Sequence, residues 1–299
     1  MITSLYKIER EVLYHELRDF FARVNMIQYA VIKGEVLSEQ IYGFLDKRRS
    51  NDIDILVEKK NVSLFENYLS RCGFKQCNDI GKNNPRSQRI MCMSYSHQIP
   101  PYHKEKFGFR LNVDINHDVL WGEYEGGRIS MDEFLSDTVD MQIYGVTVKV
   151  LSIEKTLVQL VLHHYKEMNS LYHLSQHNTI TSSMFSDVFG LIMKNQSALS
   201  LECVAYLCDK YTIGAYVYYM LYHTNLIYKN PILNLYVEYL EPYRDEAIME
   251  SFGLSPYERK CWHVPFLERL NNPNIPQYVR SKLTDADWYK IEINKSVFQ

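Results

Sequence analysis

The sequence predicts an α+β fold, in which a mixed β-sheet with flanking helices is followed by a mostly helical C-terminal domain. In the first half, short apolar or alternating runs between turn residues are typical of strands, and helix-like segments lie between them. From Ser152 onward the apolar residues recur with the period of a helix, about 3.6 residues. We therefore place a domain boundary near residue 150 of the 299, between a mixed α/β domain (1–150) and a helical domain (151–299).

The first predicted elements follow from the placing of the apolar residues. Residues 5–24 carry apolar side chains at helical spacing. Residues 29–32 form a short apolar run that ends at Lys33-Gly34, which predicts a buried strand followed by a turn. The same reasoning predicts a helix over residues 35–44, a polar loop over 47–51, a strand over 52–57 and a helix over 62–72.

The rest of the first domain combines an irregular segment with further strands. Turn residues are frequent in residues 76–106, where residues 89–95 are the one stretch that could form a strand. Residues 109–116 alternate between apolar and polar side chains, which places Asp114 on the polar face of a predicted strand. Residues 142–150 alternate around a glycine, as a β-hairpin would.

Composition narrows the class of protein. The formal charge of −3 and the sequence pI near 6.4 do not favour broad binding to a nucleic-acid backbone, which needs a basic surface. No window approaches the roughly 18 consecutive apolar residues that a membrane span needs. The N-terminal residues have no apolar core of a signal peptide, and the six cysteines form no C-x-x-C pair. We therefore expect a cytoplasmic protein with reduced thiols that does not act on membranes or long nucleic acids.

Asp52 and Asp54 are the first candidate site residues. They are two positions apart on a predicted strand, so both carboxylates point to the same face. Two carboxylates at this spacing repel each other unless a positive charge lies between them, and Mg²⁺ is often held by one or two carboxylates together with substrate phosphates. Two solvated acids at the start of a strand are the simpler interpretation of this pair alone. The apolar residues that follow make the strand a buried one, where unpaired acids are costly.

Three further features add to this pair. Lys33-Gly34 lies between a strand and a helix, where a glycine lets backbone N–H groups approach phosphate oxygens, although an ordinary turn would look the same. Asp114 offers a third carboxylate, as a two-metal site requires, although an exposed acid on an edge strand is the alternative. His117 follows this strand, and we rank packing or orientation above catalysis for it.

These motifs resemble the DNA polymerase beta-like nucleotidyltransferase superfamily, whose pattern is a glycine turn, a D-x-D strand and a third acid on a later strand. The matching segments are V-I-K-G-E-V-L, R-R-S-N-D-I-D-I-L-V and V-D-I-N-H. More narrowly, the chain resembles the uncharacterised nucleotidyltransferase family (NTP_transf_5 type), whose members also tend to carry a histidine on a helix after the acids. Here L-V-L-H-H, ending at His164, has that place, and the resemblance covers roughly residues 28–195.

The resemblance implies an enzyme that moves a nucleoside monophosphate from a nucleoside triphosphate such as ATP to an acceptor hydroxyl or phosphate, releasing pyrophosphate. Asp52, Asp54 and Asp114 would be catalytic and would hold Mg²⁺, with Mn²⁺ as the alternative. The acceptor would be a small molecule or a protein, and the helical domain could bind it. The residues expected to bind the phosphates are Lys33, Gly34, Arg48 and Arg49, and those with an accessory role are His117 and His164.

Two departures from the pattern keep other functions open. Many members of the superfamily have Gly-Ser at the turn, where the serine contacts phosphate, whereas this chain has Gly34-Glu35. An acid here would repel a triphosphate, so we expect Glu35 to point away or to face an acceptor. The alternatives are a non-catalytic nucleotide-binding or antitoxin-like protein of the same fold and, next, a D-x-D glycosyltransferase. The histidine of the third segment is also displaced by one residue, because Asn116 stands where the narrower family would place it.

Overall fold

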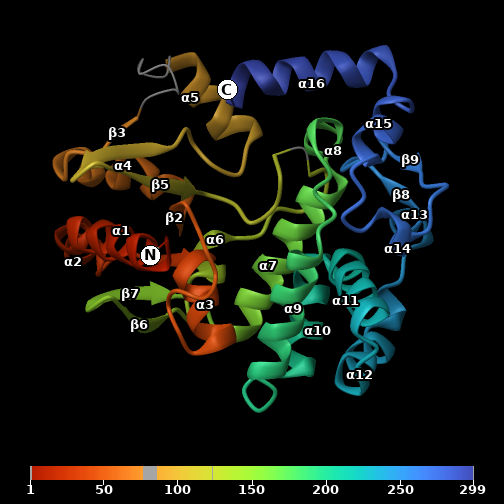
Figure 1. The fold of residues 1–299 in the computed structure, drawn as a ribbon, viewed down its shortest axis with the longest axis horizontal. Helices are drawn as coiled ribbons and strands as arrows, with labels where there is room; N and C mark the ends of the chain where they lie inside the picture. The colour runs from red at the N-terminus through yellow and green to blue at the C-terminus, as the bar shows by residue number, and fades with distance from the viewer. Residues whose placement is uncertain (1, 77–85, 123, 299) are drawn as a thin grey trace. The chain divides into compact units, whose positions relative to one another are not determined.

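The computed structural model describes residues 2–76, 86–122 and 124–298 (Figure 1). Its internal contacts divide the chain into two compact units. Among the described residues, the first unit contains those up to Gly122 together with Ile129–Ser152, and the second contains 124–128 together with Ile153–Phe298.

The first unit combines helices and strands that alternate along the chain. Several of them have the predicted bounds or nearly so, because their apolar residues follow a strict strand or helix period. The elements are α1 (Ile2–Glu16), α2 (Arg18–Val24), β1 (Tyr29–Ile32), α3 (Gly34–Tyr42), β2 (Asp52–Val57), the 3₁₀ turn η1 (Lys59–Asn61), α4 (Val62–Arg71), β3 (Lys75–Gln76), α5 (Arg86–Tyr95), β4 (Tyr102–Lys106), β5 (Phe109–Asn116), α6 (Met131–Phe134), β6 (Val139–Ile143) and β7 (Val146–Val150).

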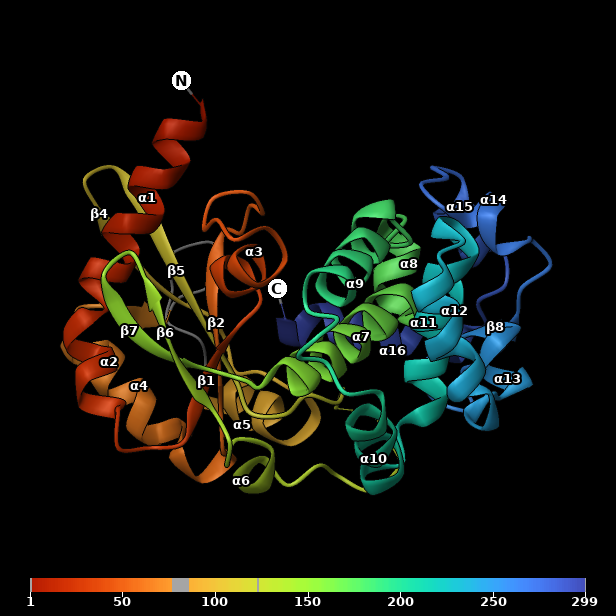
Figure 2. The same ribbon diagram turned by 90° about the horizontal axis from the view of Figure 1, so that it is seen from below.

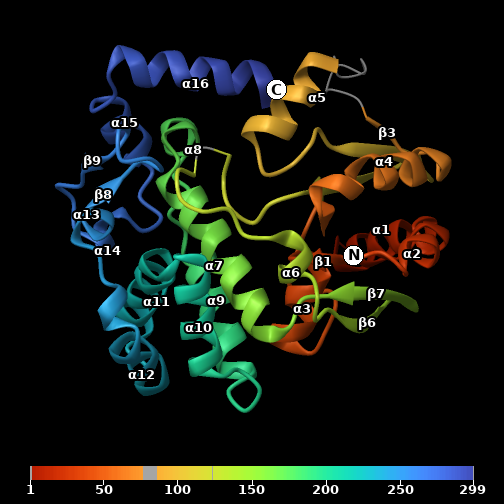
Figure 3. The same cartoon turned by 180° about the vertical axis from the view of Figure 1, so that it is seen from behind.

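The strands form one mixed sheet with the order β3-β4-β5-β2-β1-β7-β6. β2 pairs in parallel with β5 and antiparallel with β1, while β1 also pairs in parallel with β7. Figures 1 and 3 show the β6–β7 hairpin at one edge of this sheet. The two strands that carry the predicted acids are therefore direct neighbours in the middle of the sheet.

One face of the sheet is covered by α1, α2 and α4, which lie to one side of the strands in Figure 2. Phe20, Phe21 and Phe65 of these helices pack in a core cluster with the alternate strand residues Ile53 and Ile55. Since successive strand residues point to opposite faces, the residues between them, Asp52 and Asp54 among them, belong to the other face.

Two predictions for the first unit are wrong in detail. The segment over residues 89–95, predicted as a strand, is part of helix α5. Its buried residues Cys92 and Ser96 lie four apart, as on one face of a helix, while Ile90 and Tyr95 are exposed. The segment predicted as otherwise irregular also contains strand β4, which pairs with β5 along its whole length. Residues 77–85 of that segment lie outside the described residues.

The second unit is mostly helical, and its central helices α7, α9 and α11 pack against one another (Figure 3). No helix in the described part of the chain combines the length and the apolar character that a membrane span requires. The predicted fold class is confirmed: a mixed sheet with flanking helices, followed by a mostly helical region. The elements are α7 (Ile153–Asn169), α8 (Leu171–Gln176), α9 (Ser182–Lys194), α10 (Leu201–Tyr211), α11 (Gly214–Tyr228), α12 (Pro231–Tyr239), η2 (Glu241–Tyr243), α13 (Glu246–Met249), β8 (Ser251–Phe252), β9 (Lys260–Cys261), α14 (Phe266–Arg269), α15 (Ile275–Arg280) and α16 (Asp285–Phe298).

Candidate functional site

The pairing of β2 with β5 brings the three predicted acids together. Asp54 lies directly opposite Asp114, and Asp52 lies opposite Asn112 in the parallel register. Residues paired in register on neighbouring strands point to the same face, about 5 Å apart at their Cα atoms. Three carboxylates from distant parts of the sequence therefore share one small area of the sheet.

Asp54 is the most enclosed of the three acids, with 6% of its surface exposed. The Lys33 Nζ atom lies 2.9 Å from Asp54 Oδ1 and forms an ion pair with it. The Asn116 side-chain amide donates a second hydrogen bond to the same oxygen, at 3.1 Å. Burial opposes the charge of the Lys33 amine, but the carboxylate of Asp54 outweighs this and raises the pKa of Lys33 above its ordinary value.

Asp52 and Asp114 have weaker compensation. Burial, followed by the charge of Asp54, raises the pKa of Asp52, although a hydrogen bond from the Ser50 hydroxyl at 2.9 Å opposes this. Asp114 keeps partial contact with solvent, yet burial and the charges of Asp54 and Asp52 raise its pKa to about 8. Lys33 is the positive group that lowers it. The cluster thus holds three carboxylates and one ammonium group, and its electrostatic field favours an added cation.

The donor set fits a magnesium site that substrate completes. Carboxylate oxygens are the ligands Mg²⁺ prefers, and the Lys33 ammonium marks a place where a positive charge is stable. Within the described residues, no group of three or more His, Cys, Asp or Glu residues has the arrangement of a complete metal cage. Mg²⁺ sites in phosphate-transferring proteins usually use one or two carboxylates plus substrate phosphates and waters, so a complete protein cage is not required.

The Lys33-Gly34 turn has an unusual backbone that directs Lys33 toward the acids. Lys33 has φ 60° and ψ −147°, and Gly34 has φ +41° at the first position of α3. A non-glycine residue with positive φ is strained by contact of its Cβ with the backbone, so this conformation has to be held by its surroundings. The Lys33–Asp54 ion pair is one contact that holds it.

Glu35, the residue that departs from the family pattern, points away from the acids. Its side chain is 1% exposed and forms a two-pronged ion pair with Arg10 of α1, with Nε–Oε1 at 2.6 Å and Nη2–Oε2 at 2.8 Å. The hydroxyl of Tyr14 donates to Oε2 at 3.2 Å. The Arg10 Nη2 also donates to the Asp52 carbonyl oxygen at 2.7 Å, which ties this pair to the start of β2. Glu35 is therefore neutralised on the helix-covered side of the turn.

Arg48 and Arg49 lie in the loop that leads into β2. The backbone N–H of Arg48 donates to the Ser38 Oγ at 2.9 Å, and its carbonyl oxygen lies 3.3 Å from the Tyr6 hydroxyl. Arg49 is exposed, and its guanidinium lies over the Tyr6 ring, 6.0 Å from the ring centre. Both are close in sequence to the acids, while their measured contacts are with α1 and α3.

The two predicted accessory histidines lie in different units. His117 is 5% exposed directly after β5, and its backbone N–H donates to the His97 carbonyl at 2.8 Å. His164 lies on α7 of the second unit, is 4% exposed, and its Nε2 is 3.9 Å from Asp187 Oδ2. The burial of both agrees with a packing or orienting role in their own units.

Sequence reasoning missed three residues of the site. Asn116 was considered equally plausible as a surface residue, yet it is 2% exposed and binds Asp54, and the alternation that places it beside Asp114 was the available signal. Ser50 lies two residues before Asp52, on the same side of an extended segment, and that spacing was its signal. Arg10 carries one too: it lies four residues after Tyr6 and four before Tyr14, within the apolar stripe of α1.

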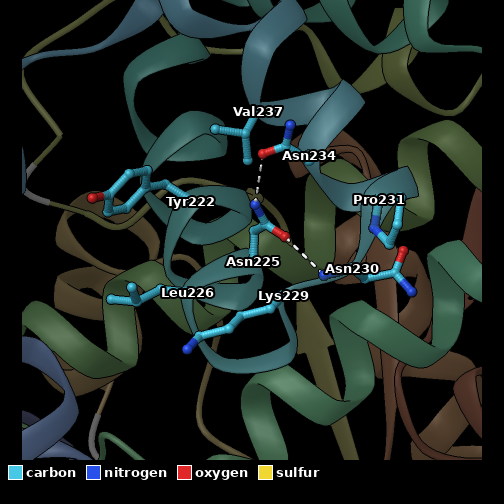
Figure 4. Close-up of a pocket in the computed structure, with 8 residues that line it drawn as sticks. All are labelled: Tyr222, Asn225, Leu226, Lys229, Asn230, Pro231, Asn234 and Val237. Carbon is cyan, nitrogen blue, oxygen red and sulfur yellow. Dashed lines mark hydrogen bonds between the residues drawn. The ribbon is translucent and has the colours of Figure 1, made fainter.

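The second unit contains a separate cavity of about 590 Å³ between α11 and α12 (Figure 4). Asn225 crosses it, donating to Asn234 Oδ1 at 3.2 Å and accepting from the Asn230 backbone N–H at 3.2 Å. Lys229 is the one charged residue of its lining. The lining contains no carboxylate and no histidine, so the carboxylate chemistry of the described residues lies in the first unit.

Comparisons with known proteins agree with this chemistry. No curated protein matches the chain. Among solved structures, it is similar to an antigenic nucleotidyltransferase-like protein from Paracoccidioides brasiliensis, with 16% identity and a TM-score of 0.35, over 71% of this chain and 91% of that one. The sequence profile of the family described as uncharacterised nucleotidyltransferase matches residues 8–229, which includes every acid of the cluster. The chain therefore belongs to the uncharacterised nucleotidyltransferase family.

Proposed function

We propose that this protein is a Mg²⁺-dependent nucleotidyltransferase. It transfers a nucleoside monophosphate group from a nucleoside triphosphate to an acceptor hydroxyl or phosphate and releases pyrophosphate. The observation that carries the proposal is the cluster of Asp52, Asp54 and Asp114 around a single lysine, beside a glycine turn, in a chain of a nucleotidyltransferase family. Like charges gathered at one place without equal compensation cost stability, which a functional requirement for a cation explains.

Asp52, Asp54 and Asp114 are the residues that would hold Mg²⁺, or Mn²⁺ in its place. When bound, the cation neutralises triphosphate charge, stabilises the departing pyrophosphate and lowers the pKa of the acceptor hydroxyl. Asn116 keeps the Asp54 carboxylate in a fixed orientation through its 3.1 Å hydrogen bond. That orientation matters because the reacting groups in phosphoryl transfer are activated mostly by positioning and electrostatics.

The turn and the basic residues near it would bind the phosphates. The backbone at Gly34 begins helix α3, whose N–H groups and dipole favour an anion. Lys33 is the resting counter-ion of Asp54, and it becomes available to a phosphate oxygen once another cation replaces it there. Arg48 and Arg49 in the loop before β2 would bind the outer phosphates, for which arginine is well suited.

The two parts of the chain would divide the work. Residues 1–150 form the catalytic domain in this proposal, and residues 151–299 bind the acceptor, a small molecule or a protein. A non-catalytic nucleotide-binding function was favoured by the acid at the turn. The pairing of Glu35 with Arg10 removes that argument, because the carboxylate is neutralised and faces away from the acid cluster.

The test is pyrophosphate release from each of the four nucleoside triphosphates, with Mg²⁺ or with a chelator, over a panel of acceptors. We expect the wild-type chain to release pyrophosphate with Mg²⁺ and Asp54→Asn to lose at least about 1,000-fold in rate, close to 4 kcal/mol of transition-state stabilisation. Asp140→Asn is the matched control, because Asp140 is exposed on the β6–β7 hairpin. Full activity of Asp54→Asn would overturn the proposal, as would nucleotide binding without release for every acceptor.

A further inference from the structure

Ser50 has a position that its place in the sequence, outside every strand and helix, does not explain. A Cβ atom built on Gly34 would meet both the Cβ and the Oγ of Ser50 at 3.5 Å. The same Oγ donates a hydrogen bond to Asp52 Oδ1 at 2.9 Å. The Ser50 hydroxyl therefore stands between the glycine turn and the first acid of the cluster, in contact distance of both.

The backbone of Ser50 is held there by α1. The Ser50 N–H donates to the Tyr6 hydroxyl oxygen at 2.9 Å. The Tyr6 hydroxyl in turn donates to Glu35 Oε1 or to the Arg48 carbonyl oxygen, each at 3.3 Å. One side chain thus links the loop before β2 with the first turn of α3, and it fixes the distance between Ser50 and the turn.

The chemistry of this place selects a phosphate-bearing ligand. A serine hydroxyl has one proton to donate, and in the resting protein that proton goes to the Asp52 carboxylate. A ligand that reaches both the turn and the acids brings anionic oxygens beside Ser50, and a hydrogen bond to an anionic oxygen is stronger than one between neutral groups. A nucleobase or a sugar has no comparable anionic acceptor.

We propose that the Ser50 hydroxyl donates a hydrogen bond to the β- or γ-phosphate of a bound nucleoside triphosphate, and that Tyr6 is the residue that positions it. This inference rests on the proposed function, because it places the triphosphate at the turn and the acids. It makes Ser50 a determinant of specificity for triphosphates over monophosphates. It also gives the N-terminal helix a direct part in the site, through a contact 44 residues away in sequence.

The first experiment measures the dissociation constants of ATP and AMP in the presence of Mg²⁺, by calorimetry, for the wild-type chain and two variants. Ser50→Ala is expected to weaken ATP binding about 10-fold or more, as the loss of a hydrogen bond to a charged group does, and to leave AMP binding within about twofold. Ser50→Thr keeps the hydroxyl and should retain most of the ATP affinity. Ser70→Ala on α4 is the matched control, since the Ser70 hydroxyl bonds only its own helix at Glu66.

The second experiment separates positioning from stability. Tyr6 and Tyr14 both donate to Glu35, but the Ser50 N–H bonds Tyr6 alone of the two. Tyr6→Phe should weaken ATP binding in the same direction as Ser50→Ala, by a few-fold, whereas Tyr14→Phe should lower the melting temperature without changing the ratio of ATP to AMP affinity. Equal effects of Tyr6→Phe and Tyr14→Phe on that ratio would show that Tyr6 acts only on stability.

The outcomes distinguish this inference from the proposed function. If the wild-type chain binds ATP and Ser50→Ala binds it equally well, the Ser50 contact is wrong while the proposed function stands. If Ser50→Ala loses AMP affinity as much as ATP affinity, the hydroxyl does not act on the outer phosphates. If the wild-type chain binds ATP without releasing pyrophosphate, the proposed function fails, and the affinity ratio still decides the role of Ser50. A wild-type chain that binds no nucleotide refutes both.

Discussion

Two groups of buried charge flank the Lys33-Gly34 turn, and they differ in how completely each is neutralised. On the side covered by α1, Glu35 meets Arg10 in a two-pronged ion pair with both side chains 1% exposed. On the other side, Asp52, Asp54 and Asp114 share one lysine. The first group satisfies its own charge, whereas the second does not.

The difference separates a structural from a functional use of buried charge. A paired and hydrogen-bonded charge can be kept inside a protein, and its removal leaves the partner uncompensated. A cluster of like charges with incomplete compensation costs stability in the resting protein, and relief comes from a bound cation or substrate. Substitutions in the two groups should therefore act in opposite directions on stability, and the predictions below test this contrast.

The largest expected effect is on activity, in Asp114→Asn. The asparagine keeps the shape of the side chain but removes one of three like charges, so pyrophosphate release should fall at least about 1,000-fold. Thermal unfolding at pH 8, without added Mg²⁺, should show a melting temperature equal to or above that of the wild-type chain, because repulsion with Asp54 and Asp52 is removed. A clear loss of stability in Asp114→Asn would contradict the contrast, and Asp140→Asn again serves as the control.

The sequence predicted the strands of this cluster well and its geometry only in part. Residues 52–57 and 109–116 have the predicted bounds, because apolar residues on one face of a strand must repeat every second position. The register that sets Asp54 opposite Asp114 depends on β5 pairing with β2, and strand order is decided by the packing of the whole sheet. The helix α5 was missed because a short apolar run fits both a strand and a helix.

The neutralisation of Glu35 illustrates what single residues in a sequence do not reveal. An acid beside a glycine turn reads as repulsive to a triphosphate until its partner is known. The partner, Arg10, is 25 residues away on a helix, and its position in the apolar stripe becomes meaningful only with the fold. Ser50 and Asn116 were within reach of a pattern argument, because each shares a strand face with an acid.

The next effect is on stability, in Glu35→Gln. The change leaves the buried Arg10 guanidinium without an anion, which should cost about 3–5 kcal/mol in the free energy of unfolding. Combining Arg10→Met with Glu35→Leu removes both charges and should recover part of this loss, although the Asp52 carbonyl then loses the hydrogen bond from Arg10. Urea unfolding of the three forms gives the comparison. If the double variant is no more stable than Glu35→Gln, the cost does not come from an unpaired charge.

The smallest effect extends the contrast to a buried titratable group in the helical unit. His223 on α11 is 3% exposed, its Nδ1 lies 2.8 Å from the Tyr219 carbonyl oxygen, and its ring packs on Phe266 with centroids 4.0 Å apart. Burial lowers the pKa of His223 to about 3, with a further lowering by the positive charge of Arg269 and an opposing effect of the bond to Tyr219. The folded protein therefore keeps this imidazole neutral over the range in which an unfolded chain protonates it.

The sign of the pH dependence follows from this difference. Between about pH 6.5 and pH 3 the unfolded state binds more protons at His223 than the folded state, so stability falls as the pH falls. From pH 7.5 to pH 5.5 the share of this residue should be about 1 kcal/mol. Urea unfolding at both pH values should show a smaller difference for His223→Phe than for the wild-type chain, while His263→Gln, at an exposed site of the same unit, should keep it. An unchanged difference in His223→Phe would mean that the buried imidazole does not govern the acid sensitivity of the helical unit.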